Sequence, residues 1–403
     1  MKREFNIWVI SQFSGAPNLG GVQRHFLLAQ HWKKKGYDPI VFADPGHHLI
    51  FPDRRRYKQG IEEIDGVKFY WIPSGKHPQT SLLRFLPMFV FALKLAWIRL
   101  SSQLPKPQFI ILSTMSIFPM PTLFWLKWRF GVSKCVVEVR DLWPLTPILM
   151  HGISKWNPLI LYMKFLERWG YRKADAIVSV LPKADAYINP ISQNPAKFKY
   201  IPNGIPDVLL EDNLKQKHTP KDSSKIRLTY AGALGIGNGM DAFMEFLAKQ
   251  PEDISAQYEF EFIGTGYRKA DYEKALAQVS NVTFYPKITR AELHKRLAQT
   301  DICFIAWRDL PLYRFGVAAQ KYFDYMAAGK PILAAHAGID DFVVQSQGGI
   351  VCENNPSGFL RGLRTFAKLS AAERFQMGLR GQTFVDQFRY SKIAEQYLEF
   401  LQS

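Results

Sequence analysis

The same local pattern occurs twice in the chain, and this repetition constrains the fold more than any other feature. Residues 5–12 read as an apolar strand, followed by a loop that contains Gly20 and Gly21 and then by a helix. Residues 226–231 read as a second such strand, followed by the glycine-rich loop 232–239 and another helix. A strand, a glycine loop and a helix open a doubly wound α/β sheet. Two such openings in 403 residues predict an α/β protein with two doubly wound domains.

We expect the first domain to span residues 1–205 and the second to span 225–384. The polar stretch 204–224, with its prolines and charges, is the expected linker. The amphipathic segment at 385–403 is expected to return to the first domain. Three scattered cysteines suit a reducing compartment, and the first ten residues lack the apolar core of a signal peptide. These features predict a cytoplasmic location.

The positive charge lies almost entirely in one half of the chain. Residues 1–200 contain 28 Lys and Arg against 12 Asp and Glu, a net charge of +16 out of +17 for the whole chain. Such an imbalance predicts an anionic partner, either a membrane or a nucleic acid. No nucleic-acid-binding motif is visible and the aromatic residues cluster with aliphatic ones, so we favour the membrane and expect no nucleic acid.

Two apolar stretches in the basic half, residues 82–100 and 117–130, fit a membrane surface. At about 100° per residue, Arg84, Lys94 and Arg99 fall within an arc of roughly 140° on a helix over 82–100. The charges argue against a membrane-spanning helix, and a basic stripe opposite an aromatic face is typical of an interfacial helix. The alternative is that both stretches are buried helices that flank the sheet.

The stretch from Tyr313 to Ile332 carries the clearest candidate site. It reads as a glycine-bearing loop, a helix, a C-terminal cap at Gly329 and a strand. Lys321 lies in the first helical turn, where an ammonium and free amides together could hold a diphosphate. Asp324 is three residues further on and could accept hydrogen bonds from a ribose diol. The alternative is a solvated ion pair on a packed helix.

A second candidate site follows the predicted strand at residues 134–139. Arg140 and Asp141 come directly after this strand, and the carboxyl ends of parallel strands border the ligand crevice. Arg140 could neutralise a diphosphate or hydrogen-bond a sugar. A structural Arg–Asp pair is the competing interpretation.

Residues 316–331 resemble the donor-nucleotide helix of family-four glycosyltransferases, which have the GT-B fold of two facing Rossmann-like domains and a C-terminal crossover helix. That family usually has two glutamates eight positions apart. Asp324 matches the second, but Gly316 stands in place of the first. A subset that builds bacterial surface polysaccharides has a small residue there and an Asn-Lys pair, which Gln320 and Lys321 resemble. This subset, which includes O-antigen UDP-N-acetylfucosamine transferases, is similar to most of the chain.

The resemblance extends to the glycine loops. The segment from Gly20 to Arg24 is similar to the family's GG-x-x-R loop beside the donor phosphate. In the second domain, Ala233 and Asn238 replace the family's usual Arg and Lys. We therefore expect Lys321 and Arg140 to supply the missing positive charge. The remaining donor contacts that the resemblance implies are Gly21, Gly235, Gly264, Thr265, Gly266, the backbone of Ile288, and Gln320.

The resemblance implies a retaining hexosyl- or N-acetylhexosaminyl-transferase that requires no metal and no cofactor. The donor would be a UDP-linked N-acetylated amino or deoxy-amino sugar, bound in the cleft. The acceptor would be a polyprenyl-diphosphate-linked sugar at the inner face of the plasma membrane, in O-antigen, capsule or exopolysaccharide assembly. Asp141 is a candidate for the base that activates the acceptor. GDP-mannose, another UDP-hexose, or a GT-B UDP-sugar epimerase remain open.

Overall fold

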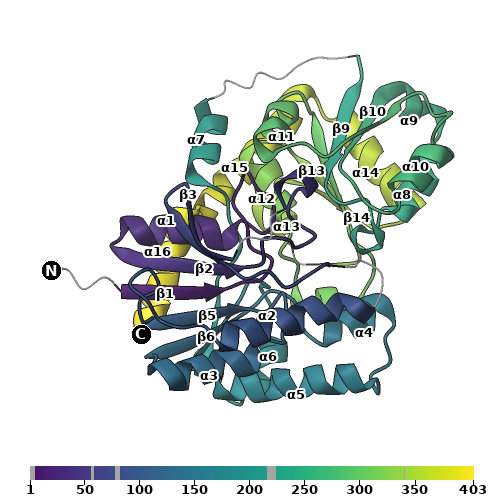
Figure 1. Cartoon of the computed structure of the whole chain (residues 1–403). Coiled ribbons are helices and arrows are strands. Elements are labelled where there is room, and N and C mark those ends of the chain that lie inside the picture. The colour runs from purple at the N-terminus through teal and green to yellow at the C-terminus, as the bar shows by residue number, and fades with distance from the viewer. Residues whose placement is uncertain (1–4, 56–58, 78–81, 216–223, 340) are drawn as a thin grey trace. The chain divides into compact units, whose positions relative to one another are not determined.

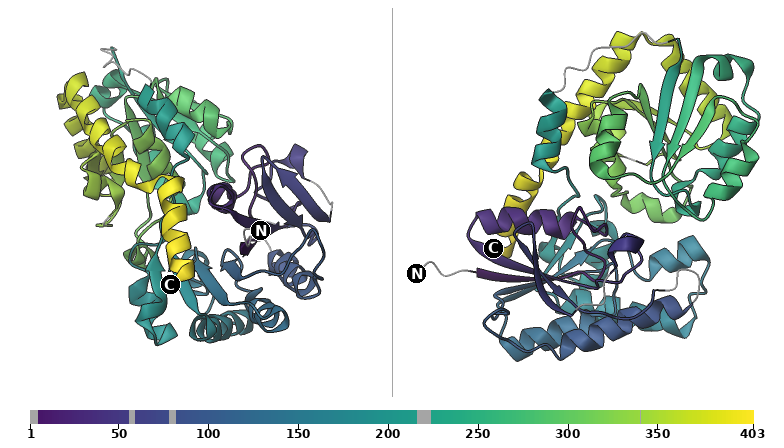
Figure 2. Two further views of the ribbon diagram at one scale, coloured as in Figure 1. Left: turned by 90° about the vertical axis from the view of Figure 1, so that its left-hand side faces the viewer. Right: turned by 45° about the horizontal axis from the view of Figure 1, so that its top comes forward.

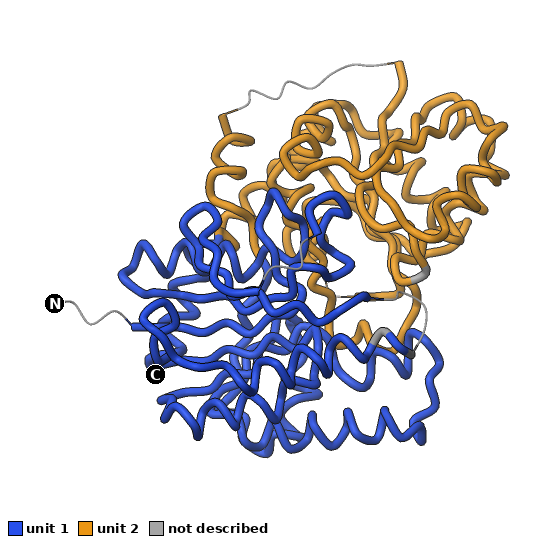
Figure 3. Tube along the Cα trace, viewed as in Figure 1, with its two compact units in different colours: residues 1–203, 390–403 blue, residues 204–389 orange. Residues whose placement is uncertain are grey.

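The computed structural model describes residues 5–55, 59–77, 82–215, 224–339 and 341–403. The chain forms two compact units, which Figure 3 distinguishes by colour. Unit 1 comprises residues 1–203 and 390–403, and unit 2 comprises residues 204–389. The limits predicted from the sequence are residues 205 and 385.

Unit 1 is built on an eight-stranded sheet in the order β3-β4-β2-β1-β5-β6-β7-β8, and all pairs except β3–β4 are parallel. The strands are β1 (Phe5–Ile10), β2 (Tyr37–Ala43), β3 (Gly60–Ile64), β4 (Val67–Trp71), β5 (Phe109–Ser113), β6 (Lys134–Val139), β7 (Ala176–Ser179) and β8 (Phe198–Tyr200). The β3–β4 hairpin is not among the elements predicted from the sequence. Its turn is Asp65-Gly66, and both residues have positive φ, which is the conformation of a tight hairpin turn.

Helices cover both faces of this sheet, as a doubly wound domain requires (Figure 1). One face carries α1 (Arg24–Lys34) and the C-terminal helix α16 (Tyr390–Gln402), and the other carries α2 (Leu86–Ala96), α3 (Met120–Phe130) and α5 (Pro158–Lys173). Two shorter helices, α4 (Leu145–His151) and α6 (Asp185–Ser192), complete the unit. The indole of Trp32 donates to the Ala394 carbonyl at 3.0 Å and packs edge-on against Tyr397. The predicted return of the C-terminal helix to the first domain is therefore confirmed.

Unit 2 contains a six-stranded parallel sheet in the order β11-β10-β9-β12-β13-β14. Figure 2 shows the chain from two further sides. Its strands are β9 (Ile226–Ala231), β10 (Tyr258–Ile263), β11 (Val282–Tyr285), β12 (Ile302–Ala306), β13 (Ile332–Ala335) and β14 (Gly349–Cys352). Its helices are α7 (Asp207–Lys215), α8 (Asp241–Ala248), α9 (Glu252–Gln257), α10 (Lys269–Ala275), α11 (Arg290–Leu297), α12 (Gln320–Ala327), α13 (Phe342–Ser346), α14 (Pro356–Lys368) and α15 (Ala371–Val385). Helix α7 lies inside the stretch predicted to be only a linker.

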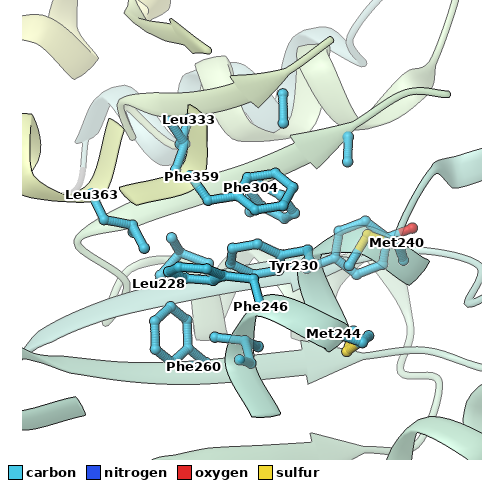
Figure 4. Close-up of a cluster of buried hydrophobic side chains, with 14 of the residues drawn as sticks. Leu228, Tyr230, Met240, Met244, Phe246, Phe260, Phe304, Leu333, Phe359 and Leu363 are labelled. Carbon is cyan, nitrogen blue, oxygen red and sulfur yellow. The ribbon is translucent and has the colours of Figure 1, made fainter. Parts of the chain in front are cut away.

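An aromatic core fixes the central strands of unit 2 (Figure 4). Phe243 of α8 stacks on Phe304 of β12 with ring centroids 4.1 Å apart, and Phe359 of α14 meets Phe243 edge-on at 5.0 Å. Such ring pairs add to the free energy gained by burying apolar surface. The core thus anchors β9 and β12, the two strands whose carboxyl ends carry the candidate donor residues.

Candidate functional site

Helix α12 holds Lys321 in place, because its C-terminus and its buried face are well defined. The side chains of Tyr322, Tyr325 and Met326 are fully buried. At the C-terminus, Gly329 has φ +64°, and its amide and that of Lys330 donate to the carbonyls of Met326 and Tyr325. This arrangement is a Schellman motif, which favours glycine. The predicted cap is confirmed.

The ammonium group of Lys321 lies in a niche of aromatic rings and amide groups. Its Nζ donates to the Tyr230 hydroxyl at 3.1 Å and to Asn238 Oδ1 at 2.9 Å. It lies 4.5 Å from the ring centroid of Tyr230 and 5.5 Å from that of Trp307. Within the described residues, no carboxylate forms an ion pair with it. Burial lowers its pKa to about 7, so an anionic ligand would stabilise the charged form strongly.

The two glycine loops of unit 2 pack directly against each other beside this niche. A side chain at Gly264 would overlap the Gly232 carbonyl oxygen, and one at Gly266 would overlap the Leu234 carbonyl oxygen. The amide of Leu234 donates to the carbonyl of Thr265 at 2.9 Å. In the described part of the chain, the Gly235 amide has no hydrogen-bond acceptor. The structure thus brings Gly235, Asn238, Gly264, Thr265 and Gly266 together with Lys321, as predicted from the sequence.

Asp324 differs from its prediction. Its Oδ1 accepts from Arg290 Nε at 2.7 Å and from His294 Nε2 at 3.1 Å, and its side chain is only 8% exposed. Burial alone would raise the pKa of Asp324, but Arg290 and His294 lower it. The prediction that Asp324 and Lys321 face one ligand as a pair is therefore wrong for this structure. Asp324 is a buried ion-pair partner of α11, whereas Lys321 points to the glycine loop.

Two other predicted donor residues border this ion pair. Ile288 precedes Arg290 by two residues, so the pairing of Arg290 with Asp324 fixes the loop that contains Ile288 next to α12. The side chain of Gln320 donates to the Gly204 carbonyl at 2.7 Å. That contact ties the start of α12 to the start of unit 2, and it occupies the amide that was predicted to reach the nucleotide.

In unit 1, Arg140 and Asp141 follow β6 as expected. Burial lowers the pKa of Arg140 and raises that of Asp141. The Nη1 atom of Arg140 is buried and has no hydrogen-bond partner among the described residues. A guanidinium with an unpaired buried donor is suited to bind an oxygen of a ligand.

The glycine loop of unit 1 requires a correction. The amide of Gly20 donates to Ala16 O at 3.1 Å and that of Gly21 to Leu49 O at 2.9 Å. Both amides are therefore used within the protein, so Gly21 cannot make through its amide the donor contact that the resemblance implies. Gly21 also lies close to His47. The Cβ of a side chain at position 21 would be 3.1 Å from Cε1 of His47.

Arg24, the last residue of the segment that resembles the GG-x-x-R loop, is buried inside unit 1. Its Nε donates to Glu138 at 3.1 Å, and its two Nη atoms donate to the carbonyls of Ile201 and Pro202. Its 2% exposure leaves no path to a donor phosphate. Arg24 therefore binds the end of β6 to the last residues of unit 1 before the chain enters unit 2.

Sequence reasoning did not identify the groups that surround Lys321 and Asp324. Tyr230 lies in a buried strand and Trp307 follows another, so their spacing is that of ordinary core residues. Arg290 and His294 lie on α11, about thirty residues before Asp324. No local pattern connects these positions, and only the strand order brings them together.

The apolar face predicted to bind a membrane is present, but its helices differ from the prediction. Helix α2 covers only Leu86–Ala96, so Arg99 lies beyond its end, and the side chain of Arg84 is outside the described part of the structure. The ammonium of Lys94 donates to Pro73 O. The single basic stripe expected over residues 82–100 is therefore wrong.

Exposed apolar residues nevertheless lie on or directly beside three neighbouring helices of unit 1, α2, α3 and α5. Trp97 and Trp128 are 79% and 74% exposed. Helix α3 packs against both α2 and α5, and we call the following residues the aromatic face: Leu86, Leu93, Trp97, Trp125, Trp128, Leu161 and Phe165. Among the described residues, no helix is both long and apolar enough to cross a membrane.

Comparisons with known proteins agree with this architecture. Residues 20–204 match the family model described as "Glycosyl transferase 4-like domain", and residues 225–368 match "Glycosyl transferases group 1". No curated protein sequence matches the chain closely enough to count as a relative.

Several solved structures share the fold over almost their whole length. Sucrose-phosphate synthase from Thermosynechococcus elongatus has a TM-score of 0.73 at 16% identity, and the match covers 99% of this chain and 98% of that one. Anabaena HepE in complex with UDP and glucose has a TM-score of 0.67 at 14% identity, with 99% and 100% covered. WaaG, a glycosyltransferase involved in lipopolysaccharide biosynthesis, has a TM-score of 0.64 at 13% identity, with 98% and 99% covered.

The chain is a glycosyltransferase with the GT-B fold. The evidence is its two parallel-sheet units, its crossover helix and the two domain matches. Together the two models cover most of the chain. It belongs to the family-four glycosyltransferases, which combine these two domains.

Proposed function

We propose that this enzyme transfers an N-acetylated amino or deoxy-amino sugar, with retention of configuration, from UDP to a polyprenyl-diphosphate-linked acceptor in bacterial surface-polysaccharide assembly. The observation that carries the donor part of the proposal is the partly buried Lys321 ammonium, which has no carboxylate partner in the described chain. A diphosphate would supply the missing negative charge. The amides at the start of α12, which has no side-chain cap, and that of Gly235 would add hydrogen bonds.

Catalysis would be electrostatic. As the bond between the sugar and the diphosphate breaks, negative charge grows on the leaving nucleotide, and a preorganised ammonium stabilises that charge more than it stabilises the bound donor. The unpaired guanidinium nitrogen of Arg140 would act in the same way on the diphosphate or on the sugar. Asp141 stands near it in the chain as a candidate acceptor base, since burial raises its pKa toward the range useful for proton transfer.

The acceptor part of the proposal rests on unit 1. Exposed tryptophans beside basic residues are suited to the interface between lipid headgroups and acyl chains. The net charge of +16 in the first 200 residues would attract the anionic inner leaflet. A lipid-linked acceptor would then be presented at the membrane surface to which unit 1 binds.

The test is a panel of nucleotide sugars incubated with a short polyprenyl-diphosphate-sugar acceptor, followed by product mass and anomeric configuration by NMR. We expect a product only with a UDP-linked N-acetylated sugar, in the donor's own anomeric configuration. Transfer from GDP-mannose or a plain UDP-hexose would contradict the donor assignment. Conversion of the UDP-sugar to its epimer without an acceptor would contradict the transferase assignment.

A further inference from the structure

The indole of Trp307 lies between two consecutive side chains of α12, Lys321 and Tyr322. Its ring centroid is 5.5 Å from the Nζ atom of Lys321, and its Nε1 donates to the hydroxyl of Tyr322 at 2.8 Å. Consecutive residues of a helix point about 100° apart, so a ring that contacts both side chains is held from two directions. The indole therefore joins the ammonium of the candidate donor site to buried polar groups of unit 2 that make no donor contact.

The direction of the hydrogen bonds around Tyr322 follows from the chemistry of its partners. An indole nitrogen can only donate, so the Tyr322 oxygen accepts from Trp307 and its own hydrogen goes to Oδ2 of Asp341 at 2.7 Å. Burial, and then the carboxylate of Asp341, raise the pKa of Tyr322 well above its usual value, so the hydroxyl keeps this hydrogen. Both Tyr322 and Asp341 are buried, and the two bonds are therefore shielded from water.

Asp341 is itself fixed by four hydrogen-bond donors. Its Oδ1 accepts from two amides of α13 at 2.9 and 3.2 Å, where Asp341 caps the helix. Its Oδ2 accepts from Tyr322 and from Nε2 of His336, which is 3.1 Å away. Nδ1 of His336 accepts from the amide of Ile339, and this contact places a ring hydrogen on Nε2. The carboxylate thus has one orientation, and it gives the Tyr322 hydroxyl one orientation as well.

The main chain of Trp307 is tied to the glycine loop 232–239. Nδ2 of Asn354 donates to the carbonyl of Trp307 at 2.9 Å and to that of Gly239 at 3.0 Å. The ring of Tyr313 meets the indole edge-on at 5.4 Å, and its hydroxyl donates to the carbonyl of Gly237 at 3.0 Å. The backbone at Trp307 is thereby fixed relative to the loop, and the Tyr322 hydroxyl fixes the nitrogen end of the indole.

The ammonium of Lys321 depends on these ring faces, because no carboxylate in the described part of the chain pairs with it. A cation over the face of an aromatic ring is attracted by the negative charge density of that face. Members of a chain of hydrogen bonds polarise one another. Asp341 makes the Tyr322 oxygen a stronger acceptor for the indole hydrogen, and this leaves more negative charge on the ring that faces the ammonium.

We propose that Tyr322, oriented by Asp341, is a positioning residue of the donor site, because it holds the indole of Trp307 against Lys321 and so keeps the ammonium at the glycine loop. This inference rests on the proposed function, in which Lys321 binds the donor diphosphate. Neither Tyr322 nor Asp341 contacts the donor. Both act through Trp307 and Lys321, and all four residues belong to unit 2.

The test is the affinity of UDP for the full chain, measured by calorimetry on variants that a thermal melt shows to be folded. Tyr322→Phe removes the hydroxyl and keeps the ring, and we expect UDP to bind about tenfold more weakly. Asp341→Asn removes the orienting charge and should weaken UDP binding in the same direction. Tyr258→Phe is the matched control, because Tyr258 is also fully buried in unit 2 and its hydroxyl donates to the Leu363 carbonyl at 2.6 Å. It should bind UDP like the wild type.

A double-mutant cycle tests whether Tyr322 acts through Lys321. In a Lys321→Met background, Tyr322→Phe should change the Kd for UDP by less than about twofold, because the ammonium that it positions is absent. An equal tenfold loss in both backgrounds would overturn the inference and leave the proposed function intact. So would a Tyr322→Phe variant that binds UDP like the wild type. If Lys321→Met alone binds UDP as tightly as the wild type, the proposed function itself is contradicted.

Discussion

The ammonium of Lys321 lies 2.9 Å from Oδ1 of Asn238, although the two residues are 83 positions apart. Asn238 occupies the loop position where related enzymes usually have a lysine. In this chain the positive charge comes from α12, and it reaches the same loop. The ammonium also lies close to Gly232, since the Cβ of a side chain at that position would be 3.4 Å from Nζ. We propose that Lys321 supplies from α12 the positive charge that a lysine at position 238 would supply from the loop.

This relationship predicts a graded effect at Asn238. Asn238→Ala removes the amide oxygen that orients the ammonium but leaves the charge itself. We expect UDP affinity to fall by about tenfold, which corresponds to the loss of one charge-assisted hydrogen bond of about 1.5 kcal/mol. Calorimetric titration with UDP measures this change in affinity. In Asn238→Asp the new carboxylate should pair with the ammonium and compete with the diphosphate. This variant should therefore bind UDP more weakly than Asn238→Ala does. Tighter binding of UDP would contradict the account.

Donor affinity should depend on pH through Lys321. Its pKa is lowered to about 7 in the free protein by burial, so the ammonium loses its proton as the pH rises above that value. A bound diphosphate favours the charged form, and affinity should therefore be highest below pH 7 and fall above it by up to about tenfold per pH unit. Titrations with UDP-N-acetylglucosamine from pH 6 to 9 measure this, because its diphosphate keeps its charge across the range. A flat profile would contradict the burial of an unpaired lysine.

Asp324 should contribute mainly to stability. Asp324→Asn leaves Arg290 and His294 facing a neutral group in a buried site, and breaking a buried ion pair costs about 3–5 kcal/mol. Because the pKa of Asp324 is lowered in the folded protein, its contribution is present above the unfolded pKa of about 4 and is lost as the pH falls below it. Urea denaturation at pH 7 and at pH 3 measures both effects. Equal stability of variant and wild type at pH 7 would disprove this role.

Arg24 should behave as a structural residue and not as a donor ligand. Arg24→Ala leaves Glu138 buried beside His25 without its main cationic partner, and removes hydrogen bonds to the two carbonyls near the end of unit 1. We expect a loss of about 3–5 kcal/mol in the free energy of unfolding. At a temperature where the variant remains folded, its Kd for UDP should equal that of the wild type. A folded variant that fails to bind UDP would restore the predicted donor role of the loop.

The aromatic face should bind anionic lipid. Replacing Trp97, at the end of α2, and Trp128 of α3 by serine removes two large exposed rings and should reduce sedimentation with vesicles containing anionic lipid by at least about tenfold. Leu214→Ser, which removes an exposed apolar side chain from α7 in unit 2, is the control and should sediment like wild type. Equal sedimentation of all three proteins would contradict the membrane part of the proposal.

Much of the fold could be predicted from the sequence because the central strands are continuous apolar runs. Strands 134–139 and 226–231 have the predicted bounds. The β3–β4 hairpin was missed because β3 is an edge strand of mixed character, and only its Asp65-Gly66 turn indicates it. The helix over 82–100 was predicted too long, since apolar content alone does not show where a helix ends.

The candidate site was harder to predict, because its contacts join distant segments. Spacing correctly placed Lys321 in the first turn of α12, but it also suggested that Asp324 shares its ligand. The three-residue interval does not specify partners, and α11 provides two donors that hold Asp324 away from the glycine loop. The hydrogen bond from Tyr322 to Asp341 likewise joins α12 to the start of α13, and nothing in the local sequence of either residue indicates the other.

The most direct test of the account is the affinity of UDP for Lys321→Met, measured by calorimetry beside the wild type. Methionine fills a similar volume without a charge, so the variant should have an equal or higher melting temperature, because burying an unpaired ammonium costs stability. We predict that UDP binds the variant about 100-fold more weakly, as expected for loss of a buried cation from a diphosphate site. A folded variant that binds UDP as tightly as the wild type would contradict the central claim.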